Sequence, residues 1–489
     1  MKRLHPASQQ ALCLVKGVAT FSILLLINVP AAAQQGMYRL RLDRPAQTIL
    51  GLGFEIQSDS IGSENLGLPD KVVAVPHNLI PSERQRLYKE MLKGFRYCRL
   101  AMGLYLRGLD QEQKHIIERY PGQMKDLKEM MDGAGFDGFA PEYWSPAPYW
   151  KSNGKYQGGS LKRFDAPFLD EFADALVADV RYLRQHGLRV SMWGLQNEPV
   201  VGHEKYSTCA YTGEQYYAAM KIIAPKIKAA FPMLPIHADS WDGQHSAGGK
   251  LIRQDAALSK LIDYWTWHRI GHNSNEQIEQ AAHFNADTLG KPVFNNEFEY
   301  LTEFLHRPQH LPKKATPDER FINTAQSLMN WFVFENSPTW FWLHALKPSY
   351  NTEASGYALG FWRPPDDDDF TRFPQLKKGH WEYNQQNWHS LKGFLQHLPW
   401  NSVRYQVEEE QVRGDNRILA WKTPAGKIGL ALTNRSGKPF RFEVALGAKK
   451  KLRGWRYTAS QAEISLAQSD APTLVAAVPH LAIEFWIEQ

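Results

Sequence analysis

The sequence predicts an α/β fold: a (β/α)8 TIM barrel that carries an all-β sandwich as a side domain. The chain has 489 residues, which is too long for one ordinary core and suits a barrel with a smaller domain. Strand and helix patterns alternate through residues 47–400, the predicted barrel. Residues 401–489 contain only short alternating strands separated by turns, which is typical of a sandwich.

The first 33 residues have the pattern of a signal peptide. Lys2, Arg3 and Lys16 supply its positive charges, residues 17–29 form an apolar run, and Ala31-Ala32-Ala33 resembles a cleavage site. The apolar run is too short to span a membrane, and no later stretch resembles a span. We therefore expect an exported protein, periplasmic or secreted from a bacterium.

Charge and composition narrow the classes of partner. Removing residues 1–33 lowers the formal net charge from +6 to +3, and no clustered basic helix remains, so we expect no nucleic-acid partner. The 16 Trp, 20 Tyr and 24 Phe residues suit a carbohydrate enzyme, because aromatic rings stack on sugar faces, although a core rich in large side chains is the simpler explanation. We expect a monomer.

The two cysteines that follow the signal peptide are Cys98 and Cys209. They could pair in an oxidising compartment, but each stands beside a predicted strand end, so we expect both to be free and buried. No spacing of Cys and His indicates a zinc site. We expect neither a metal nor an organic cofactor.

Eight segments of the barrel region read as strands, because each is a short apolar run bounded by turn residues. They cover residues 47–54, 94–103, 136–144, 188–196, 234–239, 262–268, 292–296 and 339–344.

Helices are predicted between these strands. The clearest covers residues 168–186, with Asp165 as the N-cap, Pro167 in the first turn and Gly187 after the end. Later helices are predicted over 214–231 and 317–334.

Strands also surround the barrel region in the sequence. Residues 418–422, 428–433, 440–444 and 482–487 should form strands of the sandwich. The segment 34–46, which precedes the barrel, contains a further strand that we expect to join them.

Two predicted barrel strands end on a glutamate. Residues 190–196 lead into Asn197-Glu198-Pro199, and residues 292–296 lead into Glu297. Pro199 stops the first strand, because proline lacks an N–H group. Side chains at the C-terminal ends of barrel strands face the active-site side. Glu198 and Glu297 therefore fit the two carboxyls of a retaining glycosidase, about 5–5.5 Å apart, as acid/base and nucleophile respectively.

Nearby residues offer alternatives and additions. Glu299, two residues after Glu297 and on the same side of an extended chain, is the alternative nucleophile. Asn197 is expected to hydrogen-bond the sugar 2-hydroxyl. Glu55 and Asp59, near the first strand, are interpreted as loop or rim residues. Asp366 to Asp369 is interpreted as a solvated loop, with a calcium site or a contact with a cationic substrate as alternatives.

Two segments together resemble glycoside hydrolase family 30, a family of retaining (β/α)8 enzymes. Residues 144–154, Trp-Ser-Pro-Ala-Pro-Tyr-Trp-Lys-Ser-Asn-Gly, with Gly158-Gly-Ser-Leu161, are similar to the family's third-strand segment. Residues 194–199 with 206–212 are similar to its acid/base strand and following loop. The resemblance runs from about Ile49 to Gly356 and implies Glu198 as acid/base and Glu297 as nucleophile. Asn295-Asn296 before Glu297 departs from the more usual Ser or Thr.

The resemblance and the strand positions give further candidates. Arg99, on the second strand, resembles the family's arginine that pairs with the nucleophile. Trp144 and His268 end the third and sixth strands and are candidates for substrate binding. Trp342, on the eighth strand, is favoured over Trp340 as the floor under the sugar.

The sequence thus predicts a retaining β-glycosidase acting on a poly- or oligosaccharide. One alternative is another enzyme of the same clan, with endo-xylanase- or galactanase-like specificity. The other is a non-catalytic carbohydrate-binding protein on a hydrolase scaffold.

Overall fold

The computed structural model describes residues 34–56, 74–242, 246–268, 288–298, 316–348, 358–365, 367 and 375–489. The predicted signal peptide lies outside these residues. No helix in the described ranges combines the length and the hydropathy needed to cross a bilayer.

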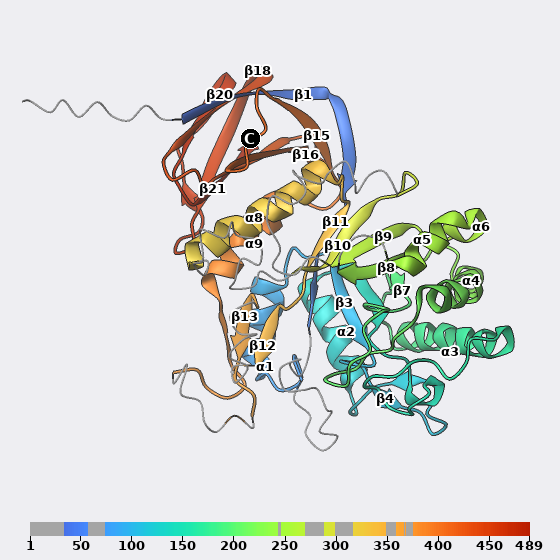
Figure 1. Cartoon of the computed structure of the whole chain (residues 1–489). Helices are drawn as coiled ribbons and strands as arrows, with labels where there is room; N and C mark the ends of the chain where they lie inside the picture. The colour runs from blue at the N-terminus through green and yellow to red at the C-terminus, as the bar shows by residue number, and fades with distance from the viewer. Residues whose placement is uncertain are drawn as a thin grey trace, which may run out of the picture. The chain divides into compact units, whose positions relative to one another are not determined.

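Eight parallel strands close into a barrel, which confirms the predicted fold class (Figure 1). The last strand pairs with the first, Thr339 with Gly51 and Trp342 with Phe54, so the barrel has no free edge. In chain order the strands are β2 (Gly51–Glu55), β3 (Tyr97–Met102), β6 (Gly138–Tyr143), β7 (Trp193–Gly194), β8 (Ile236–Asp242), β9 (Tyr264–His268), β10 (Val293–Phe298) and β11 (Thr339–Trp342).

An apolar cluster fills the barrel interior. Tyr97, Ala140, Met192, Phe294 and Phe341 pack together there, and the rings of Phe294 and Phe341 stack with centroids 5.7 Å apart. The interior is therefore a packed core and not a pore.

The residues two positions further along three strands form the next layer. Because side chains alternate along a strand, Tyr97, Ala140 and Phe294 in the apolar layer place Arg99, Glu142 and Asn296 inward as well. The barrel thus carries a polar layer directly above its apolar floor.

The predicted helices form with well-defined starts. Helix α3 (Ala166–Gln185) follows Asp165, whose side chain accepts a hydrogen bond from the Phe168 N–H at 3.2 Å. Helices α4 (Gly213–Ala230) and α8 (Pro317–Phe334) each begin with a capping box, at Thr212 and Thr316. The other described helices are α1 (Pro81–Arg86), η2 (Leu87–Met91), α2 (Gln123–Ala134), η3 (Pro148–Trp150), α5 (Ala247–Gln254), α6 (Ala256–Ser259) and α9 (Gln385–His397).

A second sheet, mostly antiparallel, contains the strand at the start of the described chain. Strand β1 (Gln34–Ile49) pairs antiparallel with β15 and parallel with β18, so the sheet folds back on itself around an apolar core. This arrangement agrees with the predicted sandwich. Its other strands are β15 (Ser402–Glu409), β16 (Asn416–Lys422), β17 (Ile428–Asn434), β18 (Phe440–Tyr457), β19 (Ile464–Ser465), β20 (Ser469–Val478) and β21 (Ala482–Glu488).

Two short sheets complete the described strands. β4 (Gly108–Leu109) pairs with β5 (Ile116–Ile117), and β13 (Gly360–Trp362) lies between β12 (Leu346–Pro348) and β14 (Trp381–Tyr383).

The strand boundaries differ from the prediction by up to three residues at several ends, and two differences have a clear physical cause. Residues 47–49 belong to β1, because the chain turns before Gly51, whose φ of +141° is a conformation that favours glycine. The strand predicted over 188–196 is regular only at Trp193–Gly194, preceded by an isolated bridge from Val190 to Phe139. Cys98 and Cys209 are free and buried, as expected.

Candidate active site

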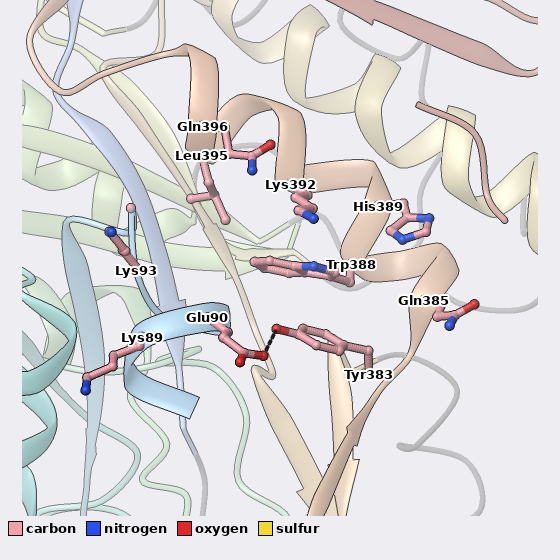
Figure 2. A pocket seen from close by; sticks show the side chains of 11 residues that line it. Lys89, Glu90, Lys93, Tyr383, Gln385, Trp388, His389, Lys392, Leu395 and Gln396 are labelled. Carbon is pink, nitrogen blue, oxygen red and sulfur yellow. Dashed lines mark hydrogen bonds between the residues drawn. The ribbon is translucent and has the colours of Figure 1, made fainter. Parts of the chain in front are cut away.

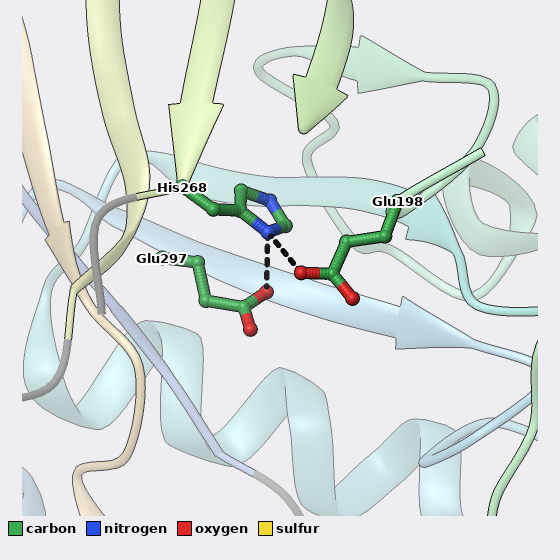
Figure 3. A group of neighbouring side chains, drawn as sticks. All are labelled: Glu198, His268 and Glu297. Atoms are coloured by element: carbon green, nitrogen blue, oxygen red, sulfur yellow. Dashed lines mark hydrogen bonds and ion pairs between the residues drawn. The ribbon is translucent and has the colours of Figure 1, made fainter. Parts of the chain in front are cut away.

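The two predicted catalytic glutamates and the predicted substrate-binding residue His268 meet at one end of the barrel. Glu198 follows β7, His268 is the last residue of β9, and Glu297 lies near the end of β10. Since the strands are parallel, their carboxyl ends share one face, where the active sites of barrel enzymes lie. Figure 3 shows the three side chains converging.

The backbone at Glu198 has an unusual conformation. Its φ of +44° is uncommon outside glycine. Its N–H donates to the Ser240 carbonyl at 2.9 Å, and its own carbonyl accepts from the Val201 N–H at 2.8 Å. Such conformations concentrate at functional sites, where the surrounding structure holds them. The strand end thus fixes the direction in which this carboxylate points.

Glu297 reaches the site through an irregularity in β10. The register of β10 against β9 shifts between Asn295 and Glu297, and the Glu297 N–H donates to the Asn295 Oδ1 at 3.0 Å. Simple alternation would turn Glu297 away from the side that Asn296 faces. A bulge-like shift re-aims a side chain, and here it turns the Glu297 carboxylate toward Arg99 and His268.

One ring nitrogen of His268 faces both glutamates (Figure 3). Its Nδ1 lies 3.1 Å from Oε1 of Glu198 and 3.6 Å from Oε2 of Glu297. One ligand atom from each of these three residues lies within 4.8 Å of the others, so the two carboxylates are close neighbours. Burial alone would lower the pKa of His268, but the charges of Glu297 and Glu198 outweigh it and raise that pKa.

Arg99 is the centre of the polar layer. It is 1% exposed, and its guanidinium contacts three carboxylates. Nη1 donates to Glu297 at 2.5 Å and to Glu55 at 3.1 Å, whereas Nε and Nη2 both donate to Oε2 of Glu142, at 2.8 and 2.6 Å. The predicted contact between Arg99 and Glu297 is present.

Glu142 is a site residue that the sequence interpretation missed. It is 1% exposed and also accepts from the Ser240 hydroxyl and from Asn296 Nδ2. Burial raises the pKa of its carboxyl, but Arg99, two histidines and the Ser240 hydroxyl outweigh this and lower that pKa to about 2. Glu142 lies two residues after Ala140, so it faces the barrel interior once Ala140 is known to do so.

Glu55 corrects the expectation of a loop or rim residue. It ends β2, is fully buried, and pairs with Arg99. Its strand-end position is the same signal that identified Glu198 and Glu297. Asp59 lies outside the described residues.

Asn197 is oriented by the same arginine. Arg99 Nη2 donates to its side-chain oxygen at 2.6 Å. Because a guanidinium can only donate, the amide oxygen of Asn197 must face it, which leaves the amide N–H groups for another partner. The Asn197 N–H itself donates to the Tyr143 carbonyl at 2.8 Å, which fixes this backbone against β6.

The two predicted tryptophans occupy different surroundings. Trp144, 2% exposed, lies under the Arg99 guanidinium, whose central carbon is 4.2 Å from the ring centroid. Trp342 is fully buried and packs on Phe298 and Trp340, with centroids 5.7 and 6.1 Å away. Trp144 therefore joins the polar layer, whereas the described contacts of Trp342 are with other aromatic rings.

Further residues bear on the site. Tyr206 is a half-buried phenol whose pKa is raised by burial, then by the charges of Glu198 and Glu297. It lies in the loop that carries the second half of the family resemblance. Glu299, the alternative nucleophile, lies outside the described residues, as do Asp366, Asp368 and Asp369.

The cluster has two possible chemical readings. Glu198, His268 and Glu297 are residue types that bind divalent metals, and their spacing would permit it. Arg99, however, places a fixed positive charge against the same Glu297 oxygen that faces His268, which opposes a cation there. A pair of carboxylates flanked by a guanidinium and an imidazole fits acid–base and nucleophilic chemistry better.

A separate hollow of about 780 Å³ lies between η2 and α9. Trp388 and Tyr383 stack within it, and the Tyr383 hydroxyl donates to Glu90 at 3.3 Å (Figure 2). None of its lining residues belongs to the carboxylate cluster. The site is therefore defined by its side chains and not by this cavity.

Solved structures of low sequence identity have the same architecture. The catalytic domain of a GH30 xylanase C from Talaromyces cellulolyticus is 12% identical, with a TM-score of 0.67 over 93% of this chain and 100% of that one. A conserved exported protein from Bacteroides fragilis is 12% identical, with a TM-score of 0.70 over 92% and 100%. An endo-β1,6-glucanase is 15% identical, with a TM-score of 0.65 over 92% and 94%.

No protein-family model matches the chain, and no curated protein matches it significantly. The structural likeness, at 12–15% identity, concerns the fold. This chain has the barrel-and-sandwich fold of glycoside hydrolase family 30 structures.

Proposed function

We propose that this protein is a family 30 glycoside hydrolase that cleaves β-linked poly- or oligosaccharides with retention of anomeric configuration. Glu198 is the acid/base and Glu297 the nucleophile. The protein acts after export, as a monomer, and its chemistry uses neither a metal nor an organic cofactor.

The observation that carries this proposal is the closeness of the two carboxylates. Their nearest ligand atoms lie within 4.8 Å. Retaining enzymes hold their carboxyls about 5–5.5 Å apart, whereas inverting enzymes need roughly 6.5–9.5 Å to fit a water molecule. The spacing therefore favours direct attack by a glutamate over attack by water.

The surrounding residues supply what such a reaction needs. Glu297 attacks the anomeric carbon while Glu198 protonates the leaving oxygen; Glu198 then takes a proton from the water that releases the sugar. Arg99 places a positive charge beside the Glu297 carboxylate through its Nη1 contact. Asn197 turns its amide oxygen toward Arg99, so its amide N–H groups are directed elsewhere and suit a sugar hydroxyl. His268 Nδ1 is hydrogen-bonded to Glu198 and lies 3.6 Å from Glu297.

The fold neighbours indicate the substrate class without selecting one member. One is described as a xylanase and another as an endo-β1,6-glucanase, and both names support a polysaccharide as the substrate of this chain. Xylanase-like, galactanase-like and glucanase-like specificities remain alternatives for this chain. A binding protein without activity is the remaining alternative, and the intact carboxylate pair opposes it.

The test is hydrolysis of a panel of β-linked plant, fungal and algal polysaccharides, with product sizes measured, by the wild type and by Glu297→Gln. We expect the wild type to cleave at least one member and the variant to lose that activity while remaining folded. Cleavage of α-linked substrates only would overturn the proposal. Binding by both proteins without cleavage would support the non-catalytic alternative.

A further inference from the structure

Arg99 divides its hydrogen bonds unequally among its carboxylate partners. Two of its three nitrogens, Nε and Nη2, donate to a single oxygen of Glu142. Only Nη1 remains for Glu297, and Glu55 shares it. Glu142 therefore receives two nitrogens of the guanidinium, whereas the carboxylate proposed as nucleophile receives one and shares it with Glu55.

Glu142 is held so that it cannot leave Arg99. Its Oε1 accepts from the Ser240 hydroxyl, and Asn296 Nδ2 donates to its Oε2 at 2.9 Å. Ser240 is fixed in turn by Thr266, with the two hydroxyl oxygens 2.7 Å apart. These three partners come from β8, β9 and β10, so the neighbouring barrel strands set the position of this carboxylate.

We propose that Glu142 is a positioning residue that draws the charge of Arg99 away from Glu297 and so keeps Glu297 basic enough to act as a nucleophile. This inference rests on the proposed function and adds to it. Without Glu142, the guanidinium would neutralise Glu297 more completely, and a less basic carboxylate attacks more slowly. Glu142 itself contacts no reacting atom.

The pH dependence that follows involves the charged groups that the described residues place around Glu297. Arg99 and His268 contact it directly, from β3 and β9. Glu198, at the end of β7, and Tyr206, in the loop beyond it, face Glu297. Arg99 is surrounded in turn by Glu55 on β2, Glu142 on β6, His237 on β8 and His344 just after β11. Removing the Glu142 charge should make the Glu297 carboxylate less basic for two reasons. It takes away a nearby negative charge, and it frees a positive one.

The experiment compares the pH profile of kcat/KM in the wild type, Glu142→Gln and Glu142→Asp. Gln is isosteric and can still accept from Arg99, but it carries no charge. We expect the acid limb, which reports ionisation of Glu297 in the free enzyme, to move down by roughly one pH unit. Asp keeps the charge but is one methylene shorter, so it should shift the limb less, in the same direction.

Glu484→Gln is the matched control. Glu484 is also 1% exposed, and a single oxygen of it likewise accepts from Nε and Nη2 of one arginine, Arg456, at 2.9 and 2.6 Å. It lies in the second sheet, so its loss should lower the melting temperature without moving the acid limb.

Two outcomes would overturn the inference. One is an unchanged acid limb in Glu142→Gln, or in Glu142→Asp if the Gln variant does not fold. The other is an equal shift in Glu142→Gln and Glu484→Gln. A wild type that cleaves no β-glycan would instead sink the proposed function, so the two failures can be told apart.

Discussion

Replacing His268 should move the acid limb of kcat/KM in the direction opposite to Glu142→Gln. His268 Nδ1 lies 3.6 Å from the Glu297 carboxylate. Two unit charges at that distance interact by about 4 to 5 kcal/mol at an effective dielectric constant of about 20, which corresponds to roughly three pKa units. This is an upper bound, because burial opposes the charge on the imidazole and Glu198 shares it.

We therefore expect His268→Asn to raise the acid limb by one to two units. Asn places an uncharged amide donor near the position of Nδ1, so it removes the charge and keeps a hydrogen-bond donor. His268→Ala removes both, and should shift the limb further, because the two carboxylates then face each other without a shared donor. The assay is kcat/KM against pH on a soluble substrate.

The sign provides the control. Loss of a positive charge beside Glu297 must raise its pKa, whereas loss of the negative charge at Glu142 must lower it. An acid limb that stays in place, or falls, in both His268 variants would refute the electrostatic reasoning. A fall in kcat at every pH with no shift would assign His268 a purely steric role.

Glu198→Gln should lose roughly 10²- to 10⁴-fold in activity on unactivated glycosides, and much less on aryl glycosides with good leaving groups; equal losses would count against Glu198 as the acid. The Glu142 carboxyl, with its pKa lowered from 4.5 to about 2, should contribute about 3 kcal/mol to the free energy of unfolding above pH 4.5, lost as the pH falls toward 2. Urea titrations of wild type and Glu142→Gln at pH 7 and pH 3 should show a smaller difference in the free energy of unfolding at pH 3 than at pH 7. Asp165→Ala should cost about 1 kcal/mol through loss of the α3 cap, with Asp165→Ser close to wild type; an Ala variant as stable as wild type would contradict it.

The sequence predicted the barrel well because its signals are local. Hydrophobic runs bounded by turns marked all eight strands, and the cap residue Asp165 marked the start of the clearest helix. The length of β7 could not be predicted, because only Trp193–Gly194 keeps ladder geometry there. The length of a strand depends on the strands that pair with it, and these are distant in sequence.

The candidate site was predictable where a residue stands at a strand end. Glu198, Glu297 and His268 come together as their positions suggested. Glu142 was not predicted, because it lies inside a strand and not at its end. Its inward direction becomes clear only when the structure shows that Ala140, two residues earlier, faces the barrel interior. Three carboxylates from different strands share one guanidinium only after the barrel has closed. No single segment of the sequence therefore carries a signal for this arrangement.

The most direct test of the central claim is covalent trapping. The protein is incubated with a 2-deoxy-2-fluoro glycoside bearing an activated leaving group, in the configuration of its best substrate, and the labelled peptide is mapped by mass spectrometry. We predict one sugar per chain, attached to Glu297. Attachment to Glu299, or an NMR time course in which the first product has the inverted configuration, would contradict the account.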